Sequence, residues 1–353
     1  MTTGKILLYV FSMVSLATVV LPFIRMDHWI FRIFDYPRVQ KFVLIAVAAG
    51  FWLICYRSQL SVMDKAMVGL LLGSMIYLLW IIMPFTALGK KMVDDDTTGK
   101  RPIRFLVANV YQENREYQKL LDLVRKNDPD ILFLVETDQP WSDAMQELDR
   151  AYPHRINVPL DNTYGMIFFS RLPVTHQEVN YLVEDTIPSI IADVTYENRT
   201  VRIYGLHPTP PVPQENEHST ERDAEILIVG KMAKKYQGPC VVFGDLNDVA
   251  WSYTTTLFLK TSGLMDPRRG RGQYNTFNAH YWLLRWPLDH YFVSGHFRVA
   301  SMRVEDPIGS DHFPISIALT LSDDDESGKL KESSSDQKLR EEKIEAGIKH
   351  EPR

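Results

Sequence analysis

The sequence predicts an α/β fold in which two β-sheets pack as a sandwich flanked by helices, preceded by a transmembrane module of three helices. Three observations support this prediction. Apolar stretches dominate residues 1–91, and short strand and helix signals alternate over residues 102–321. Several of those strands also end in a carboxylate, an amide or an imidazole.

The apolar stretches predict membrane-spanning helices at about residues 6–24, 42–56 and 67–88. The first and third can cross a hydrocarbon core of ~30 Å, and local thinning of the bilayer can accommodate the shorter second. A helical bundle buried in a soluble protein is the alternative. Because the stretches are consecutive and have basic and aromatic flanks, we expect an integral protein of the plasma (inner) membrane.

Residues 25–38, between the first two predicted spans, mix arginine with aromatic residues. This composition suits a short segment at headgroup depth, and an ordinary connecting loop is the alternative. Basic residues on the side of the following domain are Arg25, Arg32, Arg38, Lys41, Lys90 and Lys91, against Lys5, Arg57 and Lys65 on the other side. The positive-inside rule therefore favours a cytoplasmic location for that domain.

Residues 92–101 are predicted to be a polar linker, and residues 102–321 a domain that we expect to fold without the spans. The predicted strands are 103–110, 131–136, 164–169, 190–196, 201–206, 241–244, 290–294 and 313–319, and the predicted helices are 115–126 and 219–235. This pattern favours two packed sheets over a regular parallel α/β arrangement. Residues 322–353 are charged and lack aromatics, which predicts a disordered or loosely helical tail.

The net charge and the cysteine content limit which binding partners and crosslinks we expect. The net charge of −5 lacks the overall positive field of proteins that hold nucleic acid without sequence preference, so a nucleic-acid partner is open but not favoured. Cys55 and Cys240 lie in apolar runs, so no disulfide framework is expected. The oligomeric state is left open.

Polar side chains follow the apolar strands at residues Asn109, Glu136, His207, Asp245, Asn247, Asp289, Asp311 and His312. Such rim positions can converge on one pocket. Carboxylates such as Glu136 and Asp311 suit a hard cation. Asp245 suits the activation of a water molecule, and Asn247 suits hydrogen bonding to a phosphate oxygen. The two histidines are the remaining groups that can carry a proton near neutral pH.

In their order along the chain, these residues resemble the signature of the endonuclease/exonuclease/phosphatase superfamily. The matching motifs are Asn109, Glu136, GMIFFSR at 165–171, GLH at 205–207, GDLN at 244–247, LDH at 288–290 and GSDH at 309–312. The resemblance covers about 220 residues and implies a β-sandwich between helical layers. That fold agrees with the strand pattern.

The resemblance also implies roles. Glu136 would be the principal ligand of Mg²⁺ or Mn²⁺, with Asn109 and Asp311 around the metal. Asp245 would position the attacking water and Asn247 the phosphate. His207 would bind the phosphate or donate a proton, and Asp289 would orient His312. An aspartate that some nucleases carry just after the asparagine is missing in the sequence Asn109-Val-Tyr, which leaves a second metal in doubt.

We therefore expect a membrane-anchored, metal-dependent hydrolase of a phosphodiester or phosphomonoester, with a lipid or lipid-linked substrate favoured by the spans. A membrane-tethered nuclease and a catalytically silent binding or scaffold protein are the alternatives. A transporter is disfavoured because the three apolar stretches contain no ionisable residues.

A last candidate feature is the segment 268–287, which is rich in arginine and aromatic residues and ends beside Asp289. We expect Arg271 and Trp282 to contact lipid headgroups. Packing of Phe277, Trp282 and Trp286 under the sheet is the alternative, and stacking of nucleic-acid bases is less favoured.

Overall fold

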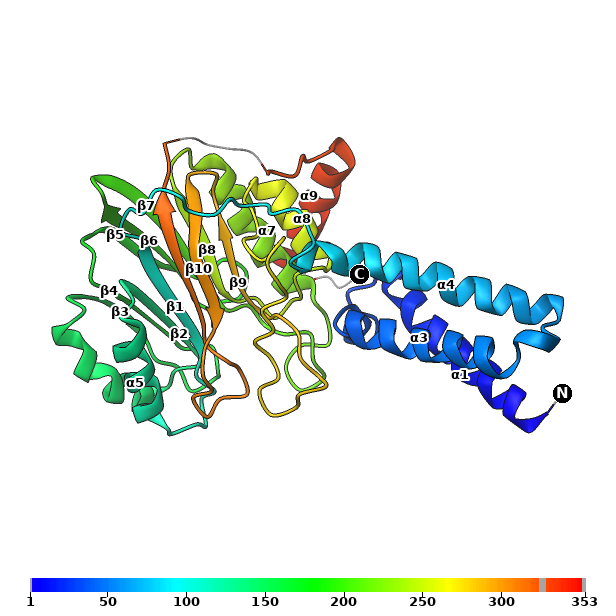
Figure 1. The fold of residues 1–353 in the computed structure, drawn as a ribbon. Helices are drawn as coiled ribbons and strands as arrows, with labels where there is room; N and C mark the ends of the chain where they lie inside the picture. Colours follow the sequence, from blue (N-terminus) through cyan, green and yellow to red (C-terminus); the bar gives the residue numbers. More distant parts are fainter. Residues whose placement is uncertain (1, 324–327, 351–353) are drawn as a thin grey trace.

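The computed structural model describes residues 2–323 and 328–350 and has two parts (Figure 1). A bundle of three long helices projects from a globular domain built on two sheets. The bundle helices are α1 (Thr3–Val20), α3 (Arg38–Cys55) and α4 (Val62–Ile82), and the 3-10 turns η1 (Leu21–Phe23) and η4 (Met83–Phe85) extend α1 and α4. All three are long and apolar enough to cross a membrane.

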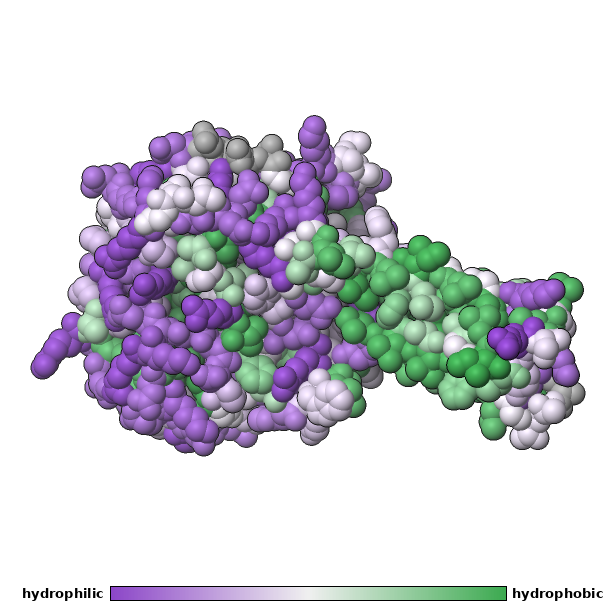
Figure 2. Space-filling model, viewed as in Figure 1, coloured by the Kyte–Doolittle hydropathy of each residue, from purple (hydrophilic) through white to green (hydrophobic). Residues whose placement is uncertain are grey.

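The outer surface of the bundle is apolar over most of its length, whereas the globular domain is largely polar (Figure 2). A contiguous apolar surface of this extent is typical of a membrane-facing region. The helices begin before the predicted apolar stretches because polar side chains near their starts find partners within the bundle. Ser61 and Asp64 form a capping box that starts α4, and Lys5 binds Asp64 at 2.6 Å.

Residues 25–38, hereafter the connecting segment, form the short helices α2 (Trp29–Arg32) and η2 (Ile33–Asp35). The segment packs against the globular domain. The backbone N–H of Trp29 donates to the carbonyl of Glu217 at 2.8 Å, and the indole N–H of Trp251 donates to the carbonyl of Asp35 at 2.8 Å. The connecting segment is therefore part of the interface between bundle and domain.

The globular domain contains one six-stranded and one five-stranded sheet, as the strand pattern and the family resemblance predicted. In spatial order the first sheet consists of β10 (Phe297–Val304), β11 (Ile315–Leu321), β1 (Ile103–Asn109), β2 (Ile131–Val135), β4 (Met166–Ser170) and β3 (His154–Val158). The second consists of β5 (Val174–Asn180), β6 (Ser189–Tyr196), β7 (Arg199–Leu206), β8 (Cys240–Asp245) and β9 (Asp289–Val293). The pairs β1–β2 and β7–β8 are parallel and the other pairs antiparallel.

Alternate residues of the strands fill the space between the sheets, where Phe105, Phe133 and Phe243 meet. Helices cover the outer faces. The first sheet carries α5 (Tyr117–Asn127), α6 (Gln139–Ala144) and the 3-10 helix η5 (Met145–Arg150), and the second carries α7 (Thr220–Lys235) and α8 (Tyr253–Ser262). The strands β3, β5 and β10 were not predicted, because these edge strands contain polar residues that are partly or fully exposed.

The segment predicted as a free linker is not free at its start. Met92 and Val93 are buried in the core between the sheets. The backbone of Asp94 and Asp96 hydrogen-bonds to Val299 at 2.9 Å, beside the edge strand β10. The packed domain therefore begins near Met92, about ten residues before the predicted boundary.

The tail was predicted to be disordered or loosely helical. The disordered alternative is wrong for residues 334–349, which form the helix α9 (Ser334–Lys349) packed against α7. Gly347 allows a close approach, since a Cβ there would lie 2.2 Å from the Cβ of Ala224. Lys343 is buried and binds both Asp27 and Asp223 at 2.8 Å. Composition suggested disorder because few apolar residues, Leu339 and Ile344 among them, pack against the domain beside the charged Lys343 and the small Gly347.

Candidate active site

The polar residues that end the strands gather at one edge of the sandwich. Asn109 ends β1, Glu136 follows β2, His207 follows β7, Asp245 ends β8, Asp289 begins β9, and Asp311 and His312 precede β11. Carboxyl ends of parallel strands and amino ends of their antiparallel neighbours share one edge of a sheet. The fold therefore brings all eight predicted site residues together, including Asn247 just beyond β8.

Asp245 lies at the centre of the group. Its Oδ2 is 3.5 Å from Nε2 of His312 and 3.9 Å from Nε2 of His207. The other ring nitrogen of His312, Nδ1, is 2.8 Å from Oδ2 of Asp289. The hydroxyl of Thr276 accepts a hydrogen bond of 3.2 Å from the backbone N–H of Asp289. His312 is thus held between two carboxylates.

Glu136 lies beside Asn109 on the neighbouring strand. The amide of Asn109 donates to Glu136 Oε1 at 2.6 Å and to Asp245 Oδ2 at 3.1 Å. The backbone N–H of Gln112 donates to the other oxygen of Glu136 at 3.3 Å. Glu136 has φ of 61°, a backbone conformation that is costly for a residue with a Cβ and is concentrated at functional sites.

The GDLN motif forms a tight turn after β8. Gly244 has φ of 134°, and a Cβ there would lie 1.9 Å from the carbonyl oxygen of Leu206, so only glycine fits. Asn247 has φ of 51°, and its side-chain amide donates to the carbonyl of Pro208 at 2.9 Å. The second N–H of that amide is available for a ligand, because a side-chain amide carries two donors.

Two side chains hold the backbone of this turn. The carbonyl of Asn247 accepts hydrogen bonds from Nη1 of Arg222 at 2.6 Å and from the hydroxyl of Tyr36 at 3.0 Å. Arg222 is fully buried and also pairs with Asp223 at 2.8 Å. Tyr36 belongs to the connecting segment, so a residue from between the first two bundle helices supports the site.

Burial and neighbouring charges shift the pKa values of the site residues in different directions. Burial raises the pKa of Glu136 to about 7 and lowers the pKa of His207 to about 4. Burial also opposes the charge on His312, but the carboxylates of Asp289 and Asp245 outweigh it and raise the pKa of His312 to about 10. Near neutral pH, His312 is therefore charged and His207 neutral.

The donor set fits a hard divalent cation. Glu136 and Asp311 line the pocket with carboxylate oxygens, which such cations prefer. Among the described residues, no lysine or arginine forms an ion pair with Glu136, and the charge of His312 only partly offsets the effect of burial on the pKa of Glu136. The Oδ1 of Asn109 accepts from the backbone N–H of Tyr111 at 2.9 Å, so Asn109 orients Glu136 in this arrangement.

A second set of ligand atoms, from Asp245, Asp289 and His312, lies within 4.8 Å of one another. Proximity alone would allow a cation there. However, the charged His312 already lies between both carboxylates, and a cation would have to displace its proton. Glu136 and Asp311 are therefore the better candidates.

The site lies in a pocket of about 490 Å³. Residues that the sequence did not predict line much of it: Trp29, Ile33, Tyr36, Tyr111, Phe277 and Trp286. The ring of Tyr36 packs edge-on against Trp286, with centroids 5.6 Å apart. The sequence showed that residues 25–38 are rich in aromatic residues. That composition predicted a segment at the membrane surface and did not predict a wall of this pocket.

In the segment 268–287, some side chains are bound within the protein and others are exposed to solvent. Arg268 is fully buried and pairs with Asp266 at 2.9 Å, and Arg271 binds Asp95 and, at 2.8 Å, the carbonyl of Val93. The expectation that Arg271 contacts headgroups is therefore wrong, because its guanidinium is bound within the protein. Trp282, by contrast, is 76% exposed.

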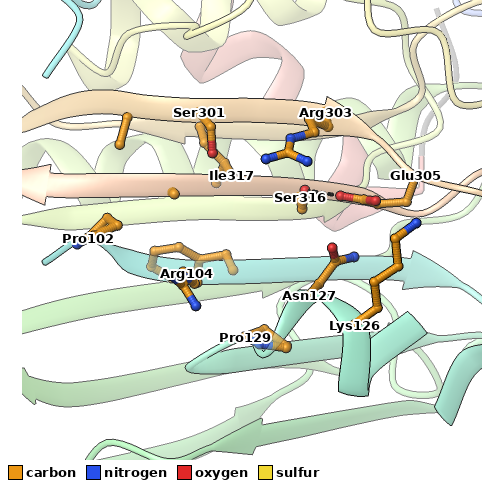
Figure 3. Close-up of a pocket in the computed structure, with 13 residues that line it drawn as sticks. Pro102, Arg104, Lys126, Asn127, Pro129, Ser301, Arg303, Glu305, Ser316 and Ile317 are labelled. Carbon is orange, nitrogen blue, oxygen red and sulfur yellow. Dashed lines mark hydrogen bonds between the residues drawn. The ribbon is translucent and has the colours of Figure 1, made fainter. Parts of the chain in front are cut away.

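A second hollow of about 360 Å³ lies on the outer face of the first sheet, at the amino end of β1 (Figure 3). Arg104, Lys126 and Arg303 surround it. Lys126 pairs with Asp306 at 2.7 Å, and Ser316 hydrogen-bonds to Glu305. It lies at the opposite end of β1 from Asn109, so we do not assign the chemistry to it.

Comparison with known proteins supports this reading of the fold. The model of the family described as "Endonuclease/Exonuclease/phosphatase family" matches residues 106–312. No curated protein matches the sequence significantly.

Many solved structures share the fold. A D. rerio TDP2 structure complexed with single strand DNA product has a TM-score of 0.53 and 16% identity, and covers 62% of this chain and 99% of its own. The human Nocturnin catalytic domain with bound sulfate has a TM-score of 0.51 and 17% identity, covering 63% and 95%. A Bacteroides vulgatus protein described as an endonuclease/exonuclease/phosphatase has a TM-score of 0.51 and 17% identity, covering 63% and 100%.

Proposed function

The chain belongs to the endonuclease/exonuclease/phosphatase family, and from this premise we propose that it is a membrane-anchored phosphoesterase that depends on a divalent cation. The observation that carries the proposal is the grouping of Glu136, Asp245 and His312 in one pocket. Together they provide a cation ligand, a base and a fixed positive charge, which are the groups that phosphoester hydrolysis requires.

Glu136 and Asp311 would hold Mg²⁺ or Mn²⁺, and Asn109 would keep Glu136 in position. When bound, such a cation acts as a Lewis acid that withdraws charge from the phosphoryl oxygens. Asp245 orients the attacking water and accepts its proton.

The other site residues stabilise charge on the phosphate. The free N–H of the Asn247 amide and the neutral ring of His207 donate hydrogen bonds to phosphate oxygens. His312 stays protonated between Asp289 and Asp245 and stabilises the negative charge that develops in the transition state. Asp289 does not line the pocket and acts through His312.

We propose that α1, α3 and α4 span the plasma (inner) membrane and leave the catalytic domain in the cytoplasm. The residues that line the pocket then favour a lipid, or a molecule linked to a lipid, as the substrate. Trp29, Ile33 and Tyr36 come from between two proposed spans and face the same space as the catalytic residues. A phosphoester at the membrane surface would therefore meet the site without leaving the bilayer.

A membrane-tethered nuclease is the second candidate. The D. rerio TDP2 structure that shares the fold holds a single strand DNA product. Tyr111 and Trp286 in the present pocket offer aromatic faces on which a base can stack. The negative net charge and the proximity of the spans make this candidate second to a lipid phosphoester.

The test is a hydrolysis screen with the purified full-length protein in detergent. Phosphodiester and phosphomonoester lipids, single-stranded DNA and generic nitrophenyl phosphoesters are each supplied with Mg²⁺, with Mn²⁺ or with excess chelator. We expect hydrolysis of at least one phosphoester with a metal ion and none with chelator.

Glu136→Gln should abolish the activity and weaken Mn²⁺ binding, because it removes a ligand charge while keeping the shape. Glu178→Gln, at an exposed position on β5, is the matched control. Full turnover in chelator would exclude metal dependence, and no turnover on any substrate would favour the catalytically silent alternative.

A further inference from the structure

Two exposed apolar segments lie beside the mouth of the pocket. One is the pair Ile30 and Ile33 of the connecting segment, which are 47% and 52% exposed. The other is the tip of the loop before β9, residues 281–284, where Tyr281, Trp282, Leu283 and Leu284 are 49–76% exposed. Consecutive exposed residues of this size mark an interaction surface. We call the two segments together the apolar rim.

A hydrogen bond holds the loop tip of the rim beside the candidate span α3. The side-chain amide of Gln40 donates to the carbonyl of Leu283 at 2.8 Å, and Gln40 is two residues after the start of α3. At a rise of ~1.5 Å per residue, Gln40 lies within one turn of the helix start. The loop tip therefore lies at the level where α3 would enter a bilayer. Figure 1 shows the loop before β9 on the side of the domain that faces the bundle.

The rim is continuous with the catalytic pocket. Ile33 and Tyr36 line the pocket together with Phe277 and Trp286, which lie on the two sides of the loop tip, and Tyr36 packs against Trp286. The ring of Phe277 lies 4.9 Å from that of His312. An apolar path thus leads from the exposed loop tip to the proposed catalytic histidine.

We propose that the apolar rim inserts into the bilayer interface and opens the catalytic pocket onto the membrane. Tyr, Trp and Leu beside Arg285 are the residue types found at headgroup depth. The span beside the loop holds these side chains at the bilayer, which favours lipid over a second copy or another protein as the occupant. With the proposed function, on which this part rests, the substrate class is a phosphoester whose apolar chain stays in the membrane.

Insertion can be tested without any enzyme activity. Trp282→Cys in a Cys55→Ser background is labelled with an environment-sensitive fluorophore, in the full chain reconstituted singly into phosphatidylcholine nanodiscs. The native Cys240 is buried, and Tyr181→Cys, at an exposed position of the globular domain, is the matched control. We expect lipids brominated on their acyl chains to quench the label at position 282 and not at 181.

Equal exposure of both labels to an aqueous quencher, with no quenching by brominated lipid, would overturn the proposal. A single copy per nanodisc excludes contact with a second copy as the source of protection. Because the readout is fluorescence, insertion can be confirmed even if the proposed function fails.

The substrate class is tested with two phosphodiesters that share one leaving group, hexadecyl p-nitrophenyl phosphate in vesicles and methyl p-nitrophenyl phosphate in solution. Trp282→Ala combined with Leu283→Ser should slow hydrolysis of the hexadecyl ester about tenfold more than that of the methyl ester, since two inserted side chains are lost. Tyr181→Ala should change neither rate. Equal effects of the double variant on both esters would overturn the substrate assignment.

Discussion

The hydroxyl of Tyr36 donates a hydrogen bond of 3.0 Å to the backbone carbonyl of Asn247, across 211 positions of sequence. One end of this bond lies between two candidate spans, and the other lies in the turn that presents the proposed phosphate contact. The orientation of the turn therefore depends on where the connecting segment is packed.

Tyr36→Phe should lower kcat about fivefold, because one neutral hydrogen bond contributes about 1 kcal/mol and its loss frees the carbonyl of Asn247. The ring packing on Trp286 is kept. Steady-state kinetics on a nitrophenyl phosphodiester give the measurement, with Tyr181→Phe as control. An unchanged kcat would show that Arg222 alone fixes the turn.

A chain that starts at Pro102 should not fold stably, contrary to the expectation from sequence that the domain is independent. It lacks Met92 and Val93 from the core and leaves Lys343 without Asp27. Breaking a buried ion pair alone costs about 3–5 kcal/mol. Circular dichroism during heating is the measurement, and melting at the temperature of the full chain would contradict the expectation.

Asp245→Asn should reduce turnover roughly a hundredfold or more, the scale for losing a general base, while keeping one of the two oxygens that accept from Asn109 and from the backbone of Asn247. His312→Gln should reduce it by a similar factor. His312→Ala is less informative, since it leaves the buried carboxylates of Asp245 and Asp289 without their cation. Asp306→Asn, on the surface, is the control, and loss of activity only through unfolding would make either role structural.

Stability should depend on Glu225, a buried carboxyl group on α7 that takes no part in the proposed chemistry. Burial raises the pKa of Glu225 to about 8 from 4.5. The folded chain therefore keeps a proton that the unfolded chain has released, so the free energy of unfolding falls as pH rises from about 4.5 to 8.

Glu225→Gln should remove this fall in the free energy of unfolding. It should stabilise the protein at pH 9 by a few kcal/mol, on the order expected for a pKa shift of this size. At pH 4 the variant and the native chain should melt alike. Thermal unfolding at both values is the measurement, and a variant that is no more stable at pH 9 would show that the carboxylate is solvated.

The side of the membrane can be tested with protease added to intact cells and to inverted membranes. Basic residues near the globular domain predict that only inverted membranes expose it. Cleavage in intact cells would place the domain outside.

The sequence predicted what local pattern can encode. Alternating apolar residues predicted most strands of both sheets, and the residues that end those strands do converge on one pocket. Tyr36 escaped prediction because nothing near it in sequence indicates a partner 211 residues away. Lys343 was read as part of a charged tail, because its two carboxylate partners lie 120 and 316 residues earlier. Long-range polar contacts have no periodic signature, so only the folded arrangement shows them.

The contact of Lys343 with Asp27 and Asp223 also sets an order of events during synthesis. At ~5–20 residues per second, Asp27 leaves the ribosome roughly 15–60 s before Lys343 does. Until then the connecting segment and α7 present two carboxylates to each other with no lysine between them. The connecting segment that carries Tyr36 can form its bonds to Glu217 and Trp251 earlier, but it gains this buried ion pair only when α9 docks. A chain released before α9 would therefore contain every residue that lines the pocket but lack the buried lysine that links the connecting segment to α7.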